Sequence, residues 1–305
     1  MGKRDVISIC DLDPAEVHRI AIRAHEIKMG DVPKILGGYS LALLFEKPSL
    51  RTRASFEVGI QMLGGHSFYM GSSEVGLGVR ESEADVAKVL SRWVRCVIAR
   101  VFSDESLRKF ARNSSVPVIN ALSDWEHPCQ ALADLQTVYE HKNRLDNLKV
   151  VFVGDGNNVA RSLALAVASV GSQFICVSPN GYELDEQTVI TACNRSPHRN
   201  QDKSVVLVTD VGHAVQGADV VYTDVWTSMG DESEIEKRRK AFAGYTVDDK
   251  LMSMAKSDAI FMHDMPAHYG EEVSPGMLDH RQSVVFDQAE NRLYAQVALL
   301  ELLLR

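Results

Sequence analysis

The stretch 41–65, LALLFEKPSLRTRASFEVGIQMLGG, places an apolar run of strand length directly before a helix. Leu41 to Phe45 form the apolar run. Apolar side chains then recur at helical spacing from Phe56 to Leu63, until Gly64 and Gly65 end the pattern. A strand that leads at once into a helix is the unit from which parallel sheets with helices on both faces are built.

The same alternation of apolar runs and amphipathic helices continues along the chain. Further strands are predicted at His66 to Met70, Cys96 to Val101, Val116 to Asn120, Val150 to Val153, Phe174 to Val177, Val205 to Val208, Val220 to Tyr222 and Ala259 to Met262. One of the intervening helices is expected to carry Val86, Val89, Leu90, Trp93 and Val94 on a single apolar face.

The strands fall into two series, which predicts an α/β protein of two domains. Each domain is expected to be a parallel sheet flanked by helices, and interdomain helices should link the two. The predicted boundaries are a first domain over 1–140, a second over 141–285, and a C-terminal helix over 286–305 that packs back across the first domain. A bridging helix is expected from about Cys129 to His141, and the last helix from about Gln288 to Leu304.

The composition excludes several classes of protein. The chain has 305 residues and a net charge of −8, which argues against nucleic-acid binding. No stretch has the roughly 18 continuous apolar residues of a membrane span, and the N-terminus lacks the apolar core of a secretory signal. Five cysteines without close pairing fit a reduced, cytoplasmic compartment. Because an acidic protein that acts on anions must gather its basic groups locally, any local arginine cluster is informative.

The segment Ser49-Leu50-Arg51-Thr52-Arg53 follows the first strand and opens a helix. A helix N-terminus presents unpaired N–H groups to an anion, hydroxyls add donors, and guanidiniums fit phosphate oxygens in bidentate fashion. The simpler interpretation is a capped surface helix with a solvated basic turn. Two arginines in a first turn oppose the helix dipole unless an anion is bound, and this favours phosphate binding.

A second segment, His127-Pro128-Cys129-Gln130, also begins a helix. An imidazole and an amide can together hydrogen-bond the carbonyl oxygen and the NH₂ of a carbamoyl group. An ordinary helix start explains these four residues equally well when they are taken alone. Cys129 is interpreted as structural, because adjacency to His127 in sequence does not provide the geometry of a nucleophile and its base.

Three more polar segments follow predicted strands, where open α/β sheets bind ligands. DVWTSMG at 224–230 offers Asp224 for an ammonium group and Ser228 with the backbone after it for polar atoms, although a turn with Asp224 as a helix cap is the alternative. HDMPAH at 263–268 matches no familiar zinc spacing, so no metal is expected. GDGNN at 154–158 lacks the third glycine of a dinucleotide fingerprint, so NAD binding is not predicted.

In this combination and order, the segments resemble the transcarbamoylase family and, within it, the ornithine branch. The matching stretches are FEKPSLRTR (45–53), HPCQ (127–130), GDGNN (154–158), DVWTSMG (224–230), FMHDMPAHYGEEV (261–273) and FDQAENRLYAQ (286–296). The resemblance extends over nearly all of the chain from about Leu41. Each stretch alone is weak, but the combination is highly specific.

The resemblance implies transfer of the carbamoyl group of carbamoyl phosphate to the side-chain amine of L-ornithine, giving citrulline and phosphate without a metal or cofactor. It also implies a carbamoyl-phosphate domain followed by an ornithine domain, a homotrimer or a multiple of one, and a cytoplasmic role in arginine biosynthesis. Carbamoyl phosphate would be bound by Ser49, Leu50, Arg51, Thr52, Arg100, His127, Gln130 and Arg292. Ornithine would be bound by Asn158, Asp224, Ser228, Met229, Asp264 and Met265. The residues expected to act in catalysis are Arg100, His127 and Asp264.

Two positions depart from the family pattern. Where the ornithine branch normally has His-Cys-Leu-Pro, this chain has His-Asp-Met-Pro, with Asp264 in place of the cysteine beside the attacking amine. A carboxylate there attracts an ammonium group but also stabilises its protonated, non-nucleophilic form, which predicts a more alkaline rate optimum. In the loop 72–82, Gly76 stands where the family usually carries a glutamine, and Arg80 is the proposed replacement donor.

Three alternatives are compatible with the sequence. One is a transcarbamoylase with another acceptor, such as putrescine or an N-acyl-ornithine, as Asp264 suggests. Another is a non-catalytic homologue that binds carbamoyl phosphate, as the missing cysteine and glutamine suggest. The third is a plain nucleotide-binding α/β protein, which the incomplete glycine fingerprint disfavours.

Overall fold

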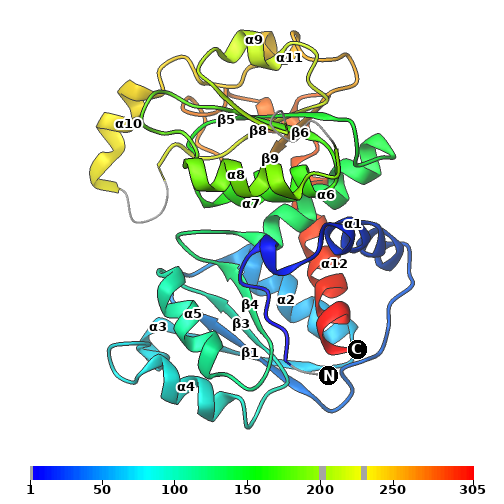
Figure 1. Ribbon diagram of the computed structural model, residues 1–305, viewed down its shortest axis with the longest axis vertical. Helices are drawn as coiled ribbons and strands as arrows, with labels where there is room; N and C mark the ends of the chain where they lie inside the picture. The colour runs from blue at the N-terminus through cyan, green and yellow to red at the C-terminus, as the bar shows by residue number, and fades with distance from the viewer. Residues whose placement is uncertain (1–2, 199–203, 228–231) are drawn as a thin grey trace. The chain divides into compact units, whose positions relative to one another are not determined.

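The computed structural model describes residues 3–198, 204–227 and 232–305, and the chain forms two compact units (Figure 1). Unit 1 comprises Met1–Gln136 with Glu290–Arg305, and unit 2 comprises Thr137–Ala289. Each unit contains one parallel sheet with helices packed on it, so the predicted α/β class is confirmed. None of the described helices combines the length and the apolar character that a membrane span requires.

The sheet of unit 1 has the strand order β2-β1-β3-β4, with every neighbouring pair parallel. Its strands are β1 (Ser40–Phe45), β2 (His66–Gly71), β3 (Val97–Arg100) and β4 (Val118–Leu122). Its helices are η1 (Ile9–Asp11), α1 (Pro14–Lys28), α2 (Leu50–Met62), α3 (Ser72–Val75), α4 (Glu83–Leu90) and α5 (Asp104–Asn113). Two further helices, α6 (Pro128–Lys142) and α12 (Val285–Leu304), each run from one unit of the chain into the other.

Both faces of the first sheet are buried, which explains why its strands read as continuous apolar runs. Ala42 and Leu44 of β1 belong to a core cluster with residues of α4 and α5. Their neighbours Leu41 and Leu43 point to the opposite face, because side chains alternate along a strand, and they are equally buried. On a helix packed there, a Cβ added to Gly59 of α2 would lie 2.9 Å from Val297 of α12, so these two helices pack closely.

The prediction of one apolar helix face over residues 86–94 is wrong in part. Val86, Leu90 and Val94 are buried, but Val89 is 42% exposed and Trp93 is 69% exposed. The helix ends at Leu90, so helical spacing does not place Trp93, whereas Val94 still joins the core cluster of Val86 and Leu90. Val89 lies within the helix, and its exposure has no such explanation.

The sheet of unit 2 has the order β7-β6-β5-β8-β9 and is again parallel throughout. Its strands are β5 (Lys149–Val153), β6 (Gln173–Val177), β7 (Val205–Val208), β8 (Val220–Thr223) and β9 (Ile260–His263). Its helices are α7 (Asn158–Ser169), α8 (Glu186–Arg195), α9 (Val211–Val215), η3 (Glu232–Glu234), α10 (Ile235–Ala241), α11 (Asp249–Met252) and η4 (Met277–Asp279). All nine predicted strands are therefore present, four in one sheet and five in the other.

The central strand of unit 2 also buries both of its faces. Val151 and Val153 of β5 belong to a core cluster that includes residues of α9 and α11. Phe152 points the other way and stacks on Tyr222 of β8, with ring centroids 5.4 Å apart.

The two strand orders fix where each unit is able to bind a ligand. In unit 1 the order reverses between β1 and β3, and in unit 2 it reverses between β5 and β8. The chain leaves the two strands at such a switch point in opposite directions, which opens a crevice beyond their carboxyl ends. The segments after β1, β3, β5 and β8 are therefore the places to look for a site.

Candidate active site

The segment after β1 forms the N-terminus of α2. Ser49 is its N-cap, and the Ser49 Oγ accepts a hydrogen bond from the backbone N–H of Thr52 at 3.3 Å. The same hydroxyl donates to Thr52 Oγ1 at 3.0 Å. The Leu50 side chain is 81% exposed, so this residue contributes to the helix end through its backbone N–H rather than its side chain.

Two buried guanidiniums converge on the Thr52 hydroxyl from other elements. Arg292 of α12 donates from Nη2 to Thr52 Oγ1 at 2.6 Å, and Arg100 at the end of β3 donates from Nη1 at 3.5 Å. Thr52 is fully buried, while Arg292 and Arg100 are 4% and 8% exposed. With Ser49, three donors point at one hydroxyl oxygen that has two lone pairs. Concentrated positive charge and surplus donors in a buried place favour an anion as ligand.

His127 lies immediately before α6 and is buried among the same charges. Burial lowers the pKa of His127 well below its usual range, and the charges of Arg292 and Arg100 lower it further. The imidazole is therefore neutral at physiological pH, with one nitrogen to donate and one to accept.

Gln130, on the first turn of α6, presents a carbonyl oxygen. Its Nε2 donates to Asp134 Oδ1 at 2.8 Å, which fixes the orientation of the amide. Its Oε1 is buried and has no hydrogen-bond partner in the described parts of the chain. A buried acceptor without a donor is costly, so this oxygen is suited to receive an N–H from a ligand.

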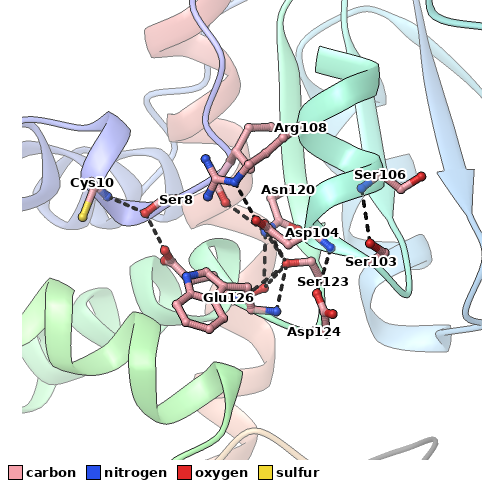
Figure 2. A network of polar contacts seen from close by, with 12 residues as sticks. Ser8, Cys10, Ser103, Asp104, Ser106, Arg108, Asn120, Ser123, Asp124 and Glu126 are labelled. Carbon is pink, nitrogen blue, oxygen red and sulfur yellow. Dashed lines mark hydrogen bonds and ion pairs between the residues drawn. The ribbon is translucent and has the colours of Figure 1, made fainter. Parts of the chain in front are cut away.

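A polar network holds the turn that presents His127 (Figure 2). Glu126, which is 2% exposed, accepts hydrogen bonds from the Ser8 hydroxyl and from the backbone N–H of Ile9. Its own backbone carbonyl accepts from the backbone N–H of Ser123 at 2.9 Å and from Asn120 Nδ2 at 3.3 Å. The N-terminal segment of the chain thus fixes the backbone just before His127, a role that no sequence motif indicated.

Cys129 is not available as a nucleophile. Its thiol donates to the backbone carbonyl of Asn120 at 3.3 Å, and burial raises the pKa of Cys129 to about 12. The thiolate, which is the reactive form, is therefore absent at neutral pH. This geometry agrees with the structural role inferred from the sequence.

Of the two arginines in the first turn of α2, Arg53 does not lie free at the helix N-terminus, contrary to the prediction. The Arg53 Nε donates to Glu57 Oε1 at 2.9 Å, and its guanidinium lies 4.0 Å from the centroid of the Tyr69 ring. The charge of Arg53 is thus compensated on the surface of the helix, and only Arg51, which is half-buried, supports the dipole argument. The anion site instead gains Arg292, which comes from the other end of the chain.

In unit 2, Asp224 lies at the carboxyl end of β8 and is 6% exposed. Asn157, after β5, donates from Nδ2 to Asp224 Oδ2 at 2.7 Å, while its Oδ1 caps α7. Asn157 therefore joins the two segments at the switch point, and sequence reasoning missed it. Its position just before a predicted helix, where asparagine is a favoured N-cap, was the available signal. The predicted Asn158 is the first residue of α7 and is half-buried.

A second connection between these segments comes from α10. Arg238 donates from Nη1 to Asp155 Oδ2 at 2.6 Å and to the backbone carbonyl of Trp226 at 2.9 Å. The predicted residues Ser228 and Met229 lie outside the described residues.

The end of β9 brings a second carboxylate to Asp224. Asp224, His263 and Asp264 each offer one potential ligand atom, and these atoms lie within 4.8 Å of one another. His263 is a poor metal ligand, because its Nδ1 accepts from the backbone N–H of Met265 at 2.8 Å and its Nε2 lies 3.1 Å from Glu272 Oε1. With both ring nitrogens engaged, the cluster is better suited to an organic cation than to a metal.

Comparison with known proteins identifies the family. The model "Aspartate/ornithine carbamoyltransferase, carbamoyl-P binding domain" matches residues 4–140, and "Aspartate/ornithine carbamoyltransferase, Asp/Orn binding domain" matches residues 146–303. The chain belongs to the aspartate/ornithine carbamoyltransferase family. It is a carbamoyltransferase, and the resemblance drawn from the sequence motifs is confirmed.

Relatives of this family match the chain from end to end. The ornithine carbamoyltransferase of Thermococcus kodakarensis is 47% identical over 308 residues, covering 100% of this chain and 97% of that one. The "Ornithine carbamoyltransferase, anabolic" of Pyrococcus furiosus is 45% identical, with the same coverage of 100% and 97%. A solved structure of ornithine carbamoyltransferase from Pyrococcus furiosus superposes with a TM-score of 0.94 at 45% identity, covering 99% of this chain and 97% of that one.

The departure from the family pattern at Gly76 has a local structural reason. Gly76 ends α3 in the left-handed conformation, with φ +54°, and a Cβ built on it would lie 2.9 Å from the Cβ of Arg80. A glutamine does not fit this loop without rearrangement. Arg80 Nη1 lies 3.5 Å from the backbone carbonyl of Glu74, so the proposed replacement donor contacts its own loop.

Proposed function

We propose that this chain transfers the carbamoyl group of carbamoyl phosphate to the side-chain amine of L-ornithine, giving citrulline and phosphate. The observation that carries the proposal is the convergence of Arg100 and Arg292 on Thr52 at a helix N-terminus, in a chain that matches this family over its whole length. Relatives named ornithine carbamoyltransferase, at 45% to 47% identity, favour ornithine over the alternative acceptors and over a non-catalytic role.

Carbamoyl phosphate binds in unit 1 at the segments after β1 and β3. The phosphate dianion is held by the hydroxyls, backbone N–H groups and guanidiniums of Ser49, Leu50, Arg51, Thr52, Arg100 and Arg292. Dianion binding by such a set needs no metal, because charge-assisted hydrogen bonds and the helix dipole supply the attraction.

The carbamoyl group is oriented by His127 and Gln130. The neutral imidazole of His127 donates to the carbamoyl oxygen, and the Gln130 Oε1 accepts from the NH₂. Arg100 adds positive charge where the oxyanion develops. Preorganised donors of this kind typically contribute about 100-fold to 1,000-fold to kcat each.

Ornithine binds in unit 2 at the segments after β5, β8 and β9. The carboxylates of Asp224 and Asp264 attract its ammonium groups, since an opposite charge within a few ångströms favours the charged form. The remaining contacts come from Asn158, Ser228, Met229 and Met265.

The reaction is a direct displacement. The deprotonated side-chain amine attacks the carbamoyl carbon, an N–C bond forms, and the carbonyl oxygen becomes a tetrahedral oxyanion held by Arg100 and His127. The oxyanion then re-forms the C=O bond, the C–O bond to phosphate breaks with its electron pair leaving on the phosphate, and the attacking nitrogen loses its proton to the departing phosphate. Most of the acceleration comes from holding the two substrates in reactive geometry, so neither a covalent enzyme intermediate nor an organic cofactor is needed.

We also propose the roles of the domains, the oligomeric state, the pathway and the compartment of this enzyme. Residues 1–140 bind carbamoyl phosphate, residues 141–285 bind ornithine, and the C-terminal helix over 286–305 completes the first domain with Arg292. The enzyme acts as a homotrimer, or a multiple of one, in arginine biosynthesis in the cytoplasm. The relative named as anabolic supports the biosynthetic direction.

An acceptor panel tests the proposal. Purified protein is incubated with carbamoyl phosphate and, separately, ornithine, putrescine or N-acetylornithine, and carbamoylated product and phosphate are measured. Ornithine is expected to react fastest. N-acetylornithine is the informative competitor, because a solved N-acetyl-L-ornithine transcarbamylase superposes with a TM-score of 0.85 at only 29% identity. Turnover of another amine without ornithine turnover, or binding of carbamoyl phosphate without any turnover, would contradict the proposal.

A further inference from the structure

Behind Asp264, two fully buried residues form a connected chain of hydrogen bonds. His263 and Glu272 each have 0% of their surface exposed. The His263 Nδ1 accepts from the backbone N–H of Met265 at 2.8 Å, and the His263 Nε2 lies 3.1 Å from Glu272 Oε1. The same carboxylate oxygen accepts from the backbone N–H of His268 at 2.5 Å.

The direction of these hydrogen bonds shows which ring nitrogen of His263 donates and which accepts. Because Nδ1 accepts a hydrogen bond, the ring proton is on Nε2 and is donated to Glu272. The Glu272 carboxylate therefore holds the loop 263–268 at both ends, through the side chain of its first residue and the backbone of its last.

The backbone inside this loop is strained. Met265 has φ +55°, in the left-handed region that residues other than glycine rarely adopt. Such a conformation persists only when the surrounding contacts determine it, and the bond from Met265 N–H to His263 is such a contact. The residue directly before Met265 is Asp264, whose carboxylate lies in the cluster with Asp224. The strained backbone thus sets where the second carboxylate points.

We propose that Glu272 is a positioning residue that acts through His263 and Met265 to hold Asp264 beside Asp224 for recognition of a cationic acceptor amine. This inference rests on the proposed function and deepens it. It gives Glu272, a buried carboxylate eight residues beyond Asp264, a part in recognising the acceptor, because Glu272 orients Asp264. The acceptor class that fits is a small amine with a free side-chain ammonium group.

The direct test is the Glu272→Gln variant. In wild type, Glu272 Oε2 is buried without a hydrogen-bond partner in the described parts of the chain. An amide that keeps its oxygen at the Oε1 position offers His263 and His268 a neutral acceptor in place of a charged one, and an amide turned the other way puts its NH₂ against their N–H groups. The first orientation weakens the chain and the second breaks it, so the KM for ornithine is expected to rise about tenfold while the KM for carbamoyl phosphate changes less than about twofold.

Two controls separate positioning from a general loss of stability. Glu271→Gln makes the same change at the neighbouring residue, which forms an ion pair with Arg239 instead of joining the His263–Glu272 hydrogen-bond chain, and both KM values should stay within about twofold of wild type. In an Asp264→Asn background, Glu272→Gln should change the KM for ornithine by less than about twofold, because effects that act through one group are not additive.

An unchanged KM for ornithine in Glu272→Gln, an equal rise in both KM values, or full additivity with Asp264→Asn would overturn the inference. If Glu272→Gln does not fold, His263→Asn takes its place, since asparagine can keep the hydrogen bond to Met265 but cannot reach Glu272. The same tenfold rise in the KM for ornithine is expected, and its absence counts against the inference. Failure of the wild-type protein to carbamoylate ornithine would instead contradict the proposed function.

Discussion

Replacing Asp264 by asparagine is expected to shift the acidic limb of the kcat profile to lower pH. Ligand atoms of Asp224 and Asp264 lie within 4.8 Å of one another, so an ammonium that contacts one carboxylate is also near the other. At roughly 4.5 Å, the attraction between unit charges is about 1 kcal/mol in water and about 4 kcal/mol at an effective dielectric constant of ~20. The Asp264 side chain is 13% exposed, which places the interaction between these limits.

This attraction raises the pKa of the bound amine, and about 1.4 kcal/mol corresponds to one pH unit. The neutral amide removes the attraction, so the pKa of the amine falls and more of it is deprotonated and nucleophilic at neutral pH. The acidic limb of kcat should therefore move down by about one pH unit or more, while the KM for ornithine rises. Asp264→Cys, which restores the residue usual in the family, should move the limb in the same direction.

The assay measures kcat with both substrates saturating, from roughly pH 6 to pH 10, because kcat reports the groups of the bound complex. Asp264→Glu is the matched control, since it keeps the negative charge and should leave the acidic limb at its wild-type pH. The reasoning is refuted if the acidic limb of Asp264→Asn lies at the wild-type pH. It is also refuted if the acidic limb of Asp264→Glu shifts as far as that of Asp264→Asn.

Three further predictions concern unit 1. Thr52→Val removes the hydroxyl that accepts hydrogen bonds from two buried guanidiniums. The cost of about 1–3 kcal/mol should appear as a roughly tenfold to hundredfold loss in kcat/KM for carbamoyl phosphate. A loss confined to kcat/KM for ornithine would contradict the assignment of Thr52 to carbamoyl-phosphate binding. Because the depressed pKa of His127 keeps its ring neutral in the folded protein while the unfolded chain protonates it, stability should fall as the pH drops below about 6.5. His127→Asn should abolish up to about 2 kcal/mol of that loss between about pH 7 and pH 5 in urea unfolding, and an identical pH dependence in both proteins would refute this. Gly76→Gln restores the residue usual in the family but should not lower the KM for carbamoyl phosphate. The reason is that the left-handed backbone at this position costs a non-glycine residue about 1–2 kcal/mol. A lower KM for carbamoyl phosphate would show that the loop rearranges.

Much of the fold was predictable because its signals are local. Parallel strands buried on both faces are apolar throughout, so Leu41 to Phe45 and its eight counterparts stand out from the amphipathic helices between them. The one helix face that was predicted wrongly fails for a local reason as well. Trp93 lies beyond Ser91, the C-cap of α4, and nothing in the spacing of apolar residues reports that the helix has already ended, whereas Val89 is exposed within the helix.

Site candidates could be named from the residues alone only where they lie at a strand end, follow a strand or open a helix, and Arg292 in α12 was named only through the family resemblance. Thr52, Arg100 and Asp224 satisfy that condition, and the structure places each of them at a switch point. Glu126 and Glu272 do not, because their importance comes from buried hydrogen bonds to segments distant along the chain or to loop backbone. A carboxylate in a polar stretch of sequence gives no sign that folding will bury it completely.

The two switch points share one geometry but carry charge of opposite sign, and this difference accounts for the substrates. Beyond β1 and β3, surplus donors and guanidiniums surround Thr52, while beyond β5 and β8 the side chains end in the carboxylate of Asp224 and the amide that holds it. The backbone of a parallel sheet does not choose between these outcomes, since strand ends at a switch point offer a crevice whatever the ligand. In a chain with a net charge of −8, the first arrangement combines Arg100 at the end of β3 with Arg292 from α12, whereas the second arises from residues close to the strand ends alone. A dianion is therefore the more demanding of the two ligands, which explains why the site for it depends on the helix at the far end of the chain.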